Sequence, residues 1–416
     1  MQAVIAIPEV PAPAGGRKAS ELLMLPVAGV PLLTRIPKTA AHAGANDLLL
    51  ICPPDLGEKA VQAFLTRALH YKVHVRVLPL SEFDPRSTSA WAELAPHLEE
   101  QFLWLPWNWV TTKQFLEDLP LVPIHTVDWA EPAHVTTNAV TTDSAAPPRS
   151  QPQGVAVTSS RSIPRAERFL VAHSGKPLDG YHTSLNRRLC RPFVRLLSHT
   201  SVTPDQITFG GVLVSVLSAV AFARGGYLYS VLGALLFYIA GLFDEMDGMV
   251  ARIKFAESPR GTWLEGVADG LSYLLLFGGI TIGLSHRYGR LAIYMGILLL
   301  FGTALALVTT SLQRRRATVP DRPNEYLGRM YQLLDKDSRN RVSRLVRTLE
   351  TFIRRGVLIH YVVIFTLIGA LPLLFLLATL GAHLTWIVTL YLNRRFFARS
   401  LDKGTTSNGI TIKEDV

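Results

Sequence analysis

The distribution of hydrophobic and polar positions divides the chain into two regions of different kind. In the first region, short apolar runs alternate with amphipathic stretches of helical spacing. The apolar runs predict strands at 3–7, 47–53 and 72–80, with 102–110 as a candidate fourth strand, and the amphipathic stretches predict helices at 31–45 and 59–71. Strands that alternate with helices favour a parallel, doubly wound α/β sheet.

A stretch rich in Thr, Ser, Pro and Ala follows, between residues 130 and 165. This composition is typical of a flexible connection, although 154–160 is a candidate strand that returns to the sheet. Beyond it, 164–175 and 184–199 are basic and amphipathic, which is typical of helices that lie along a membrane surface. We interpret Arg187 and Arg188 as anchors at that surface.

The remainder of the chain predicts an all-α membrane domain with six spans. The spans are expected at 206–224, 227–247, 266–285, 290–311, 356–372 and 374–392. Pro372 falls between the last two, and proline breaks or kinks a helix. The loop between the fourth and fifth spans holds 12 Arg and Lys against 5 Asp and Glu. By the positive-inside rule, we expect this loop and both termini in the cytoplasm.

Composition agrees with an integral membrane protein. Of the 416 residues 49% are hydrophobic, and 42 Lys and Arg against 32 Asp and Glu give a formal charge of +10. In such proteins an excess of this kind marks cytoplasmic loops and contact with anionic headgroups, so no nucleic-acid partner is expected. Cys52 and Cys190 have neither the pattern of a disulfide framework nor zinc-ligand spacing. The N-terminus lacks the pattern of a cleavable signal, so the first membrane helix is expected to direct insertion.

Four carboxylates stand at regular intervals where the second and third predicted spans meet. Asp244 and Asp247 are three residues apart and Glu265 and Asp269 are four apart, so each pair lies on one face of its helix. Acidic residues at the ends of membrane helices are costly and usually functional. Because carboxylate oxygens select hard cations, we expect a pair of divalent ions, Mg²⁺ or Mn²⁺, between them. The alternatives are an ion pathway or structural pairing with nearby basic residues.

The same stretch resembles the signature of the CDP-alcohol phosphotransferases, D-x2-D-G-x2-A-R-x8-G-x3-D-x3-D. The positions that keep its intervals are Asp244, Asp247, Gly248, Ala251, Arg252, Gly261, Glu265 and Asp269. Glu265 is the departure, since the family usually has Asp there, and its longer side chain puts rate or metal preference in doubt. The segments SVTPDQITFGG and KPLDGYHTSLNRRL also resemble the segments that precede this signature in the family, so the likeness covers about residues 163 to 400.

The resemblance implies transfer of a substituted phosphate group from a CDP-linked donor to an alcohol, with release of CMP. It implies that Asp244, Asp247, Glu265 and Asp269 hold two divalent ions, and that Asp269 also takes the proton from the attacking hydroxyl. Family members commonly dimerise through their membrane helices, so a homodimer is expected.

The resemblance also implies a binding site for the CDP group. Gly248 and Ala251 are small, so a flat cytosine can approach the helix backbone beside them. Arg252 follows one helical turn after the first carboxylates and is placed to complement phosphate charge bidentately. Gly261 would serve the cytosine in the same way, or it simply forms a turn.

The N-terminal region resembles the opening of sugar-nucleotide pyrophosphorylase-type nucleotidyltransferases in its AGGRKAS turn and its PLL…AG segment. The second, spaced glycine of their phosphate loop is missing, and LPWNWV stands where such enzymes place a metal-binding Asp. We therefore expect a degenerate nucleotidyltransferase-like domain. Its fusion to the membrane part resembles the di-myo-inositol phosphate phosphate synthases, which makes an inositol phosphate the leading substrate, with CDP-diacylglycerol an equally plausible donor.

Taken together, the sequence predicts an integral membrane CDP-alcohol phosphotransferase of phospholipid or phosphoinositol biosynthesis, with its active site on the cytoplasmic face. The expected divisions are an α/β domain at 1–160, a linker with interfacial helices at 161–203, the membrane domain at 204–400 and a tail at 401–416. Two alternatives stay open. One is a bifunctional cytidylyltransferase and phosphotransferase, and the other is a catalytically impaired scaffold or transporter.

Overall fold

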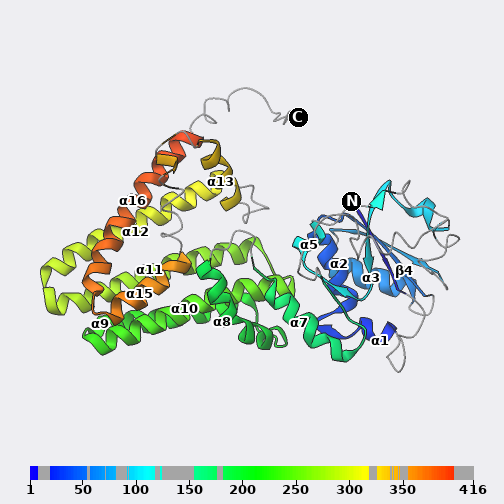
Figure 1. Ribbon diagram of the computed structural model, residues 1–416, viewed down its shortest axis with the longest axis horizontal. Helices are drawn as coiled ribbons and strands as arrows, with labels where there is room; N and C mark the ends of the chain where they lie inside the picture. The colour runs from blue at the N-terminus through cyan, green and yellow to red at the C-terminus, as the bar shows by residue number, and fades with distance from the viewer. Residues whose placement is uncertain are drawn as a thin grey trace. The chain divides into compact units, whose positions relative to one another are not determined.

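The computed structural model describes residues 1–7, 19–53, 57–70, 72–80, 91, 93–117, 122–123, 154–175, 181–317, 326–337, 340, 342–344, 346 and 355–397 (Figure 1). They fall into two compact units. The first unit comprises the described residues of Met1–Ser174 together with Arg191–Ser201 and Arg252–Phe255. The second comprises Gly175–Cys190, Val202–Ala251 and the described residues from Ala256 on.

The sheet of the first unit is built from the apolar runs. Strands β5 (His74–Pro79), β4 (Asp47–Cys52), β1 (Gln2–Ala6) and β6 (Gln101–Pro106) lie parallel in this order, and β8 (Val122–Pro123) pairs antiparallel with β6 at the edge. All of β1 is buried, as expected for a central parallel strand. The strand order reverses at β1, as in doubly wound sheets. The predicted parallel α/β sheet is therefore confirmed, whereas its nucleotidyltransferase-like identity is not.

Helices and two small ladders complete this unit. The helices are α1 (Ala19–Leu23), α2 (Leu32–His42), α3 (Glu58–Ala68), α5 (Lys113–Glu117) and α7 (Ile163–Ala172), with 3₁₀ turns at Ala95–His97 and Ser160–Ser162. In the ladders, β2 (Pro26–Val27) pairs with β3 (Val30–Pro31) and β7 (Trp109–Val110) with β9 (Val155–Ala156). Of the candidate strand at 154–160, only Val155–Ala156 forms a strand, and it pairs with β7 and not with the main sheet. Most of 14–20 and of 130–165 lies outside the described residues.

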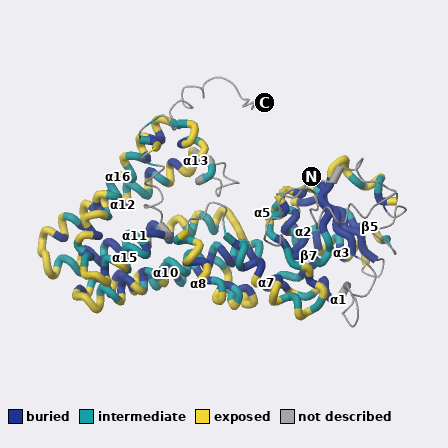
Figure 2. The backbone as a smooth tube through the Cα atoms, in the orientation of Figure 1, coloured by how far each residue is buried: buried dark blue, intermediate teal, exposed yellow. Residues whose placement is uncertain are grey.

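The core of the first unit covers the sheet with large aromatic side chains. Trp91 is fully buried, and its ring lies 5.1 Å from that of Trp104 and 6.1 Å from that of Phe102, both on β6. Figure 2 shows buried residues concentrated along the strands. Aromatic burial of this size is a major part of what stabilises a small sheet.

The second unit is helical. Its helices are α8 (Tyr181–Ser198), α9 (Pro204–Arg224), α10 (Tyr227–Lys254), α11 (Pro259–Tyr288), α12 (Arg290–Ala317), α13 (Tyr326–Lys336), α15 (Arg355–Leu367) and α16 (Leu371–Phe397), of which α8 and α10 each end in residues of the first unit. Among the described residues, five helices are long and apolar enough to cross a membrane: α9, α10, α11, α12 and α16. The apolar part of α15, Val357–Leu367, is shorter. The expected count of six spans is therefore not confirmed.

The interruption between α15 and α16 lies just before Pro372. Gly369 adopts a positive φ of 73°, and α16 begins at Leu371, so Pro372 stands in its first turn. A proline there removes no helical hydrogen bond, because the first amides of a helix have no partner in the preceding turn.

Apolar side chains point outward along the spanning helices. Leu213 of α9, Leu228 of α10 and Ile297 of α12 are 51%, 78% and 60% exposed, and Figure 2 shows exposed residues along these helices. In water such a surface would be unfavourable, but lipid tails are as apolar as leucine. The exposure therefore supports an integral membrane protein.

Helices α9 and α11 pack closely enough to exclude any side chain at two positions. A Cβ at Gly279 or Gly283 would collide with the backbone carbonyl of Ala219 or Phe222. The same pair of helices is joined by a hydrogen bond of 3.0 Å between the hydroxyls of Ser215 and Ser272. Small residues and hydroxyls are what hold membrane helices together, and this contact fixes α9 beside the predicted site on α11.

Candidate active site

The carboxylates singled out by the sequence lie on two consecutive helices. Asp244 and Asp247 belong to α10, while Glu265 and Asp269 belong to α11. Phe255, with a positive φ of 56°, follows the end of α10, and Ser258 caps α11 by accepting a hydrogen bond from the Gly261 amide. The connection between the helices is therefore short, so the carboxylates in the C-terminal half of α10 are followed closely along the chain by those in the N-terminal half of α11.

Asp247 is the most buried of the four, with only 4% of its surface exposed. The Thr208 hydroxyl, on α9, donates a hydrogen bond of 2.5 Å to its Oδ2. Asp244 and Glu265 are near enough for their charges to act on Asp247. Burying a carboxylate beside like charges costs free energy, so this arrangement favours a cationic ligand.

Asp244, Glu265 and Asp269 are each half-buried. Within the described parts of the chain, no three His, Cys, Asp or Glu side chains lie close enough together to hold a metal ion as they stand. The donor chemistry nevertheless fits a hard divalent cation, because it consists of carboxylates from two helices, three of them within electrostatic reach. The four-carboxylate metal centre stays a prediction.

The residues expected to contact CDP fall on the same two helices. Gly248 and Ala251 follow Asp247 on α10 and are half-buried. At Gly261 an added Cβ would lie 3.2 Å from the Ser258 hydroxyl and 3.8 Å from an Asp205 carboxylate oxygen. The capping turn therefore leaves little room for a side chain there, which supports a role in the turn and leaves a role in cytosine binding untested.

Arg252 already has a backbone partner. Its Nε donates a hydrogen bond of 2.5 Å to the carbonyl of Ser174, and both residues belong to the first unit. This contact fixes the direction of the guanidinium stem, and the role of Arg252 toward phosphate stays a prediction.

Sequence reasoning missed the contacts that α8 makes beside the site. Arg187, expected to be a surface anchor, is only 8% exposed and forms an ion pair of 2.9 Å with Glu245 of α10. Arg188 is exposed, as an anchor requires. Asn186 is fully buried and accepts a hydrogen bond of 3.2 Å from the Tyr238 hydroxyl.

The buried thiol of Cys190 lies on the same face of α8 and donates to the Leu242 carbonyl at 3.5 Å. Burial, together with the charge of Glu245, raises its pKa to about 12. The signal for this inner face was the recurrence of Asn186, Cys190 and Val194 at four-residue intervals. The direction of Arg187 was not readable, because long basic side chains are usually exposed.

Comparison with known proteins agrees with the signature. Residues 201–391 match the family described as CDP-alcohol phosphatidyltransferase. The bifunctional IPC transferase and DIPP synthase of Aquifex aeolicus is 24% identical over 238 residues, which are 57% of this chain and 49% of that protein. The archaetidylinositol phosphate synthase of Methanothermobacter thermautotrophicus is 31% identical over 29% of this chain and 62% of its own length.

The phosphatidylinositol phosphate synthase of Mycobacterium marinum is 30% identical over 30% of this chain and 50% of its own length. The chain thus spans about half, and at most 62%, of the length of these three curated relatives. The family match includes α9, α10 and α11 and every carboxylate described above. Residues 201–391 are therefore similar in sequence to CDP-alcohol phosphatidyltransferase domains.

Proposed function

We propose that this protein transfers a substituted phosphate group from a CDP-linked donor to an alcohol and releases CMP. The observation that carries the proposal is the family signature on α10 and α11, in which buried Asp247 lies within electrostatic reach of Asp244 and Glu265. The family generally uses divalent metal ions. We take Asp244, Asp247, Glu265 and Asp269 as the ligands of two Mg²⁺ or Mn²⁺ ions. When bound, such ions offset the charge of the diphosphate and of the departing CMP.

The chain's own groups have separate tasks in this reaction. The acceptor hydroxyl attacks the β-phosphorus of the donor, an oxygen–phosphorus bond forms, and the bond to the bridging oxygen breaks with its electron pair leaving on CMP. Asp269 accepts the hydroxyl proton, since one carboxylate near the attacking oxygen is enough for general base catalysis. Arg252 orients a phosphate, and Gly248, Ala251 and Gly261 leave room for the cytosine.

The relatives suggest one substrate class. The names of the two synthases from Methanothermobacter and Mycobacterium both contain an inositol phosphate. We therefore propose that a phosphorylated inositol is one of the two substrates, with CDP-diacylglycerol or CDP-inositol as the donor. We also propose that the site and both termini face the cytoplasm and that the protein is a homodimer in the membrane, in keeping with the basic loops and with the expectation for the family.

A screen of CMP release tests the proposal. The purified full-length chain is incubated with Mg²⁺ or Mn²⁺, with each CDP-linked donor in turn, and with inositol phosphate or glycerol phosphate as acceptor. We expect release from at least one pair, and a fall of about 100-fold or more in kcat for Asp269→Asn. Glu257→Gln is the matched control, because it removes an exposed carboxylate in the connection between α10 and α11.

The two parts of the proposal fail separately. If no donor yields CMP with the wild-type chain, the phosphotransferase assignment is wrong. If CMP is released and Asp269→Asn matches Glu257→Gln, the reaction class stands and Asp269 is not the base.

A further inference from the structure

The end of α10 belongs to a different unit from the rest of the helix. Asp244, Asp247 and Ala251 are in the helical unit, whereas Arg252–Phe255 are in the α/β unit. The signature therefore continues directly into four residues whose surroundings are set by the α/β unit. What holds those four residues can be read from contacts within that unit alone.

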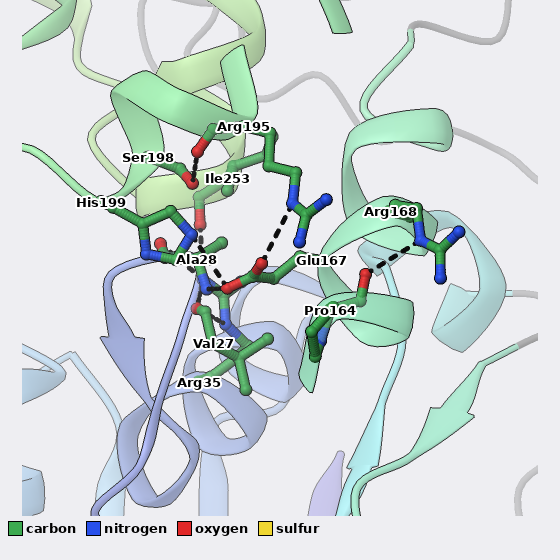
Figure 3. Close-up of polar contacts among 10 residues, drawn as sticks. All are labelled: Val27, Ala28, Arg35, Pro164, Glu167, Arg168, Arg195, Ser198, His199 and Ile253. Carbon is green, nitrogen blue, oxygen red and sulfur yellow. Dashed lines mark hydrogen bonds and ion pairs between the residues drawn. The ribbon is translucent and has the colours of Figure 1, made fainter. Parts of the chain in front are cut away.

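Arg35 of α2 is the centre of these contacts (Figure 3). It is only 2% exposed. Its Nε and Nη2 donate to the Val27 carbonyl at 3.0 and 2.7 Å, and Nη2 also donates to the Ile253 carbonyl at 3.0 Å. The last carbonyls of a helix have no partner within it, so Arg35 satisfies one of them for α10. Burial lowers the pKa of this guanidinium to about 9, and the charge of Glu167 opposes that shift, so Arg35 stays protonated at neutral pH.

The residues on either side of Ile253 are held from the same unit. The Arg35 guanidinium lies 5.2 Å from the Phe255 ring, and the His42 ring meets that ring edge-on at 5.4 Å. Lys254 donates to the Thr200 carbonyl at 2.7 Å. Arg252 donates through Nε to the Ser174 carbonyl at 2.5 Å. The last three residues of α10 and Phe255, which follows them, are thus all held by contacts within the α/β unit.

Glu167 keeps the loop under Arg35 in place. Its carboxylate is 3% exposed, accepts a hydrogen bond of 3.1 Å from the Ala28 amide, and forms ion pairs with Arg195 at 3.3 Å and His199 at 3.1 Å. Figure 3 shows this carboxylate between the loop and the end of α8. Gly29, with φ of 77°, lies so close to the Ser198 carbonyl that a Cβ would collide with it. These contacts hold the loop that carries the Val27 carbonyl, and Arg35 joins that carbonyl to the carbonyl of Ile253.

We propose that Arg35 is a positioning residue for the phosphotransfer reaction: it fixes the last turn of α10 and thereby the direction in which Arg252 meets the donor phosphate. This inference rests on the proposed function. It gives the α/β unit a task that needs no nucleotidyltransferase activity, because an arginine that binds phosphate is useful only where its stem is held.

The first test compares two arginines of the same unit. Arg35→Met removes the donor to Ile253, whereas Arg76→Met removes an arginine that pairs with Asp47 on β4 and makes no contact with α10 among those described above. We expect Arg35→Met to raise KM for the CDP-linked donor by roughly tenfold, with kcat and KM for the acceptor changed much less, because a phosphate contact made throughout the reaction contributes mainly to binding. Arg76→Met is expected to leave all three constants near wild type.

A second variant weakens the contact between Arg35 and the end of α10 by changing Phe255, and it leaves the core of the α/β unit unaltered. Phe255→Asn keeps a residue that tolerates the positive φ and removes the ring beneath Arg35. We expect the same rise in donor KM. In the double variant with Arg35→Met the rise is expected to be less than the product of the two single effects, because both changes release the same turn.

Hydrogen exchange separates failure of this inference from failure of the proposed function. In Arg35→Met, the amides of 251–256 are expected to exchange faster than in wild type or Arg76→Met, while those of β1 and β4 keep their protection. If the β1 and β4 amides lose protection as well, Arg35→Met has disturbed the whole sheet. Phe255→Asn then replaces it in the measurement of donor KM and in the measurement of hydrogen exchange. Unchanged exchange at 251–256, or a donor KM equal to that of Arg76→Met, overturns the positioning role even if CMP is released normally. A chain that releases no CMP from any donor refutes the reaction, and with it the positioning role.

Discussion

The two units of this protein differ in what surrounds their buried charged side chains. In the α/β unit, Arg35 meets backbone carbonyls and Glu167 meets Arg195 and His199. In the helical unit, Asp247 is as deeply buried, yet Asp244 and Glu265 are carboxylates whose charges oppose its own. Paired charge is compatible with a purely structural role, whereas clustered like charge raises the free energy of the folded chain. The comparison supports the proposal that the carboxylates of α10 and α11 hold a cationic ligand.

The same contrast recurs within a single helix. Glu245 and Asp247 are two residues apart on α10, so they point to different sides of it. Glu245 forms an ion pair with Arg187, and both side chains are mostly buried, at 15% and 10% exposed. Asp247 instead accepts a hydrogen bond from Thr208 and lies among carboxylates. These neighbours should therefore respond in opposite ways to neutralisation.

The largest effect is expected at Asp247. Asp247→Asn keeps an oxygen that can accept from Thr208 but removes the charge, so CMP release should fall by about 100-fold or more. The melting temperature should stay equal or rise, because a buried like charge is gone. Both quantities are measured on the full-length chain, the first at saturating Mg²⁺ and the second without it. A variant that loses stability together with activity would show that the cluster is structural, and the contrast between the units would disappear.

A smaller effect, on stability, is expected from the ion pair on the other side of α10. Arg187→Met removes the ion pair of the mostly buried Glu245 and should lower the free energy of unfolding by about 3 kcal/mol. The double variant with Glu245→Gln should recover much of this loss, because the uncompensated charge is removed. Chemical unfolding of the full-length chain in detergent measures both. If Arg187→Met unfolds like an Arg188→Met control, which alters an exposed side chain, then the pair contributes little.

The sequence predicted features that depend on a single segment, and it did not predict contacts between segments that are distant along the chain. The β1, β4 and β5 strands and the α9 to α12 spans were predictable, since period and length are properties of a single segment. The count of six spans was not confirmed, because α15 is shorter than the apolar stretch suggested. The contacts of Arg35 with Ile253 and of Thr208 with Asp247 join residues 218 and 39 positions apart. No spacing rule covers pairs of that kind.

The candidate site divides in the same way. The helices that carry Asp244, Asp247, Glu265 and Asp269 were predictable from one apolar pattern and one signature. Whether these carboxylates converge on ions depends on side-chain directions that the pattern leaves open. Arg187 and Arg188 show why such directions are hard to predict. They are neighbours in one basic amphipathic segment, yet Arg187 is buried in an ion pair with Glu245 and Arg188 is exposed.

The smallest effect concerns paired charge in the α/β unit and its dependence on pH. Burial alone would raise the pKa of Asp47, but hydrogen bonds from Arg76, Gln2 and His74 more than offset it and hold that pKa below its ordinary value of 3.8. The ionised carboxylate therefore stabilises the folded chain above about pH 4, and this contribution is lost as the pH falls through the lowered pKa. Asp47→Asn should be less stable than wild type at pH 6 by roughly 1 kcal/mol, and the difference should shrink below pH 4.

Melting temperatures of wild type and Asp47→Asn, measured from pH 3 to pH 7, check this prediction. The other carboxylates are present in both proteins, so their effects cancel in the difference between the two melting temperatures. Glu100→Gln, at an exposed position just before β6, should show no such trend. A difference between Asp47→Asn and wild type that stays constant across this range would mean that Asp47 contributes through packing and not through its charge. Asp47 would then no longer be an example of a paired charge that stabilises the α/β unit. The contrast with Asp247 would rest on Arg35 and Glu167 alone.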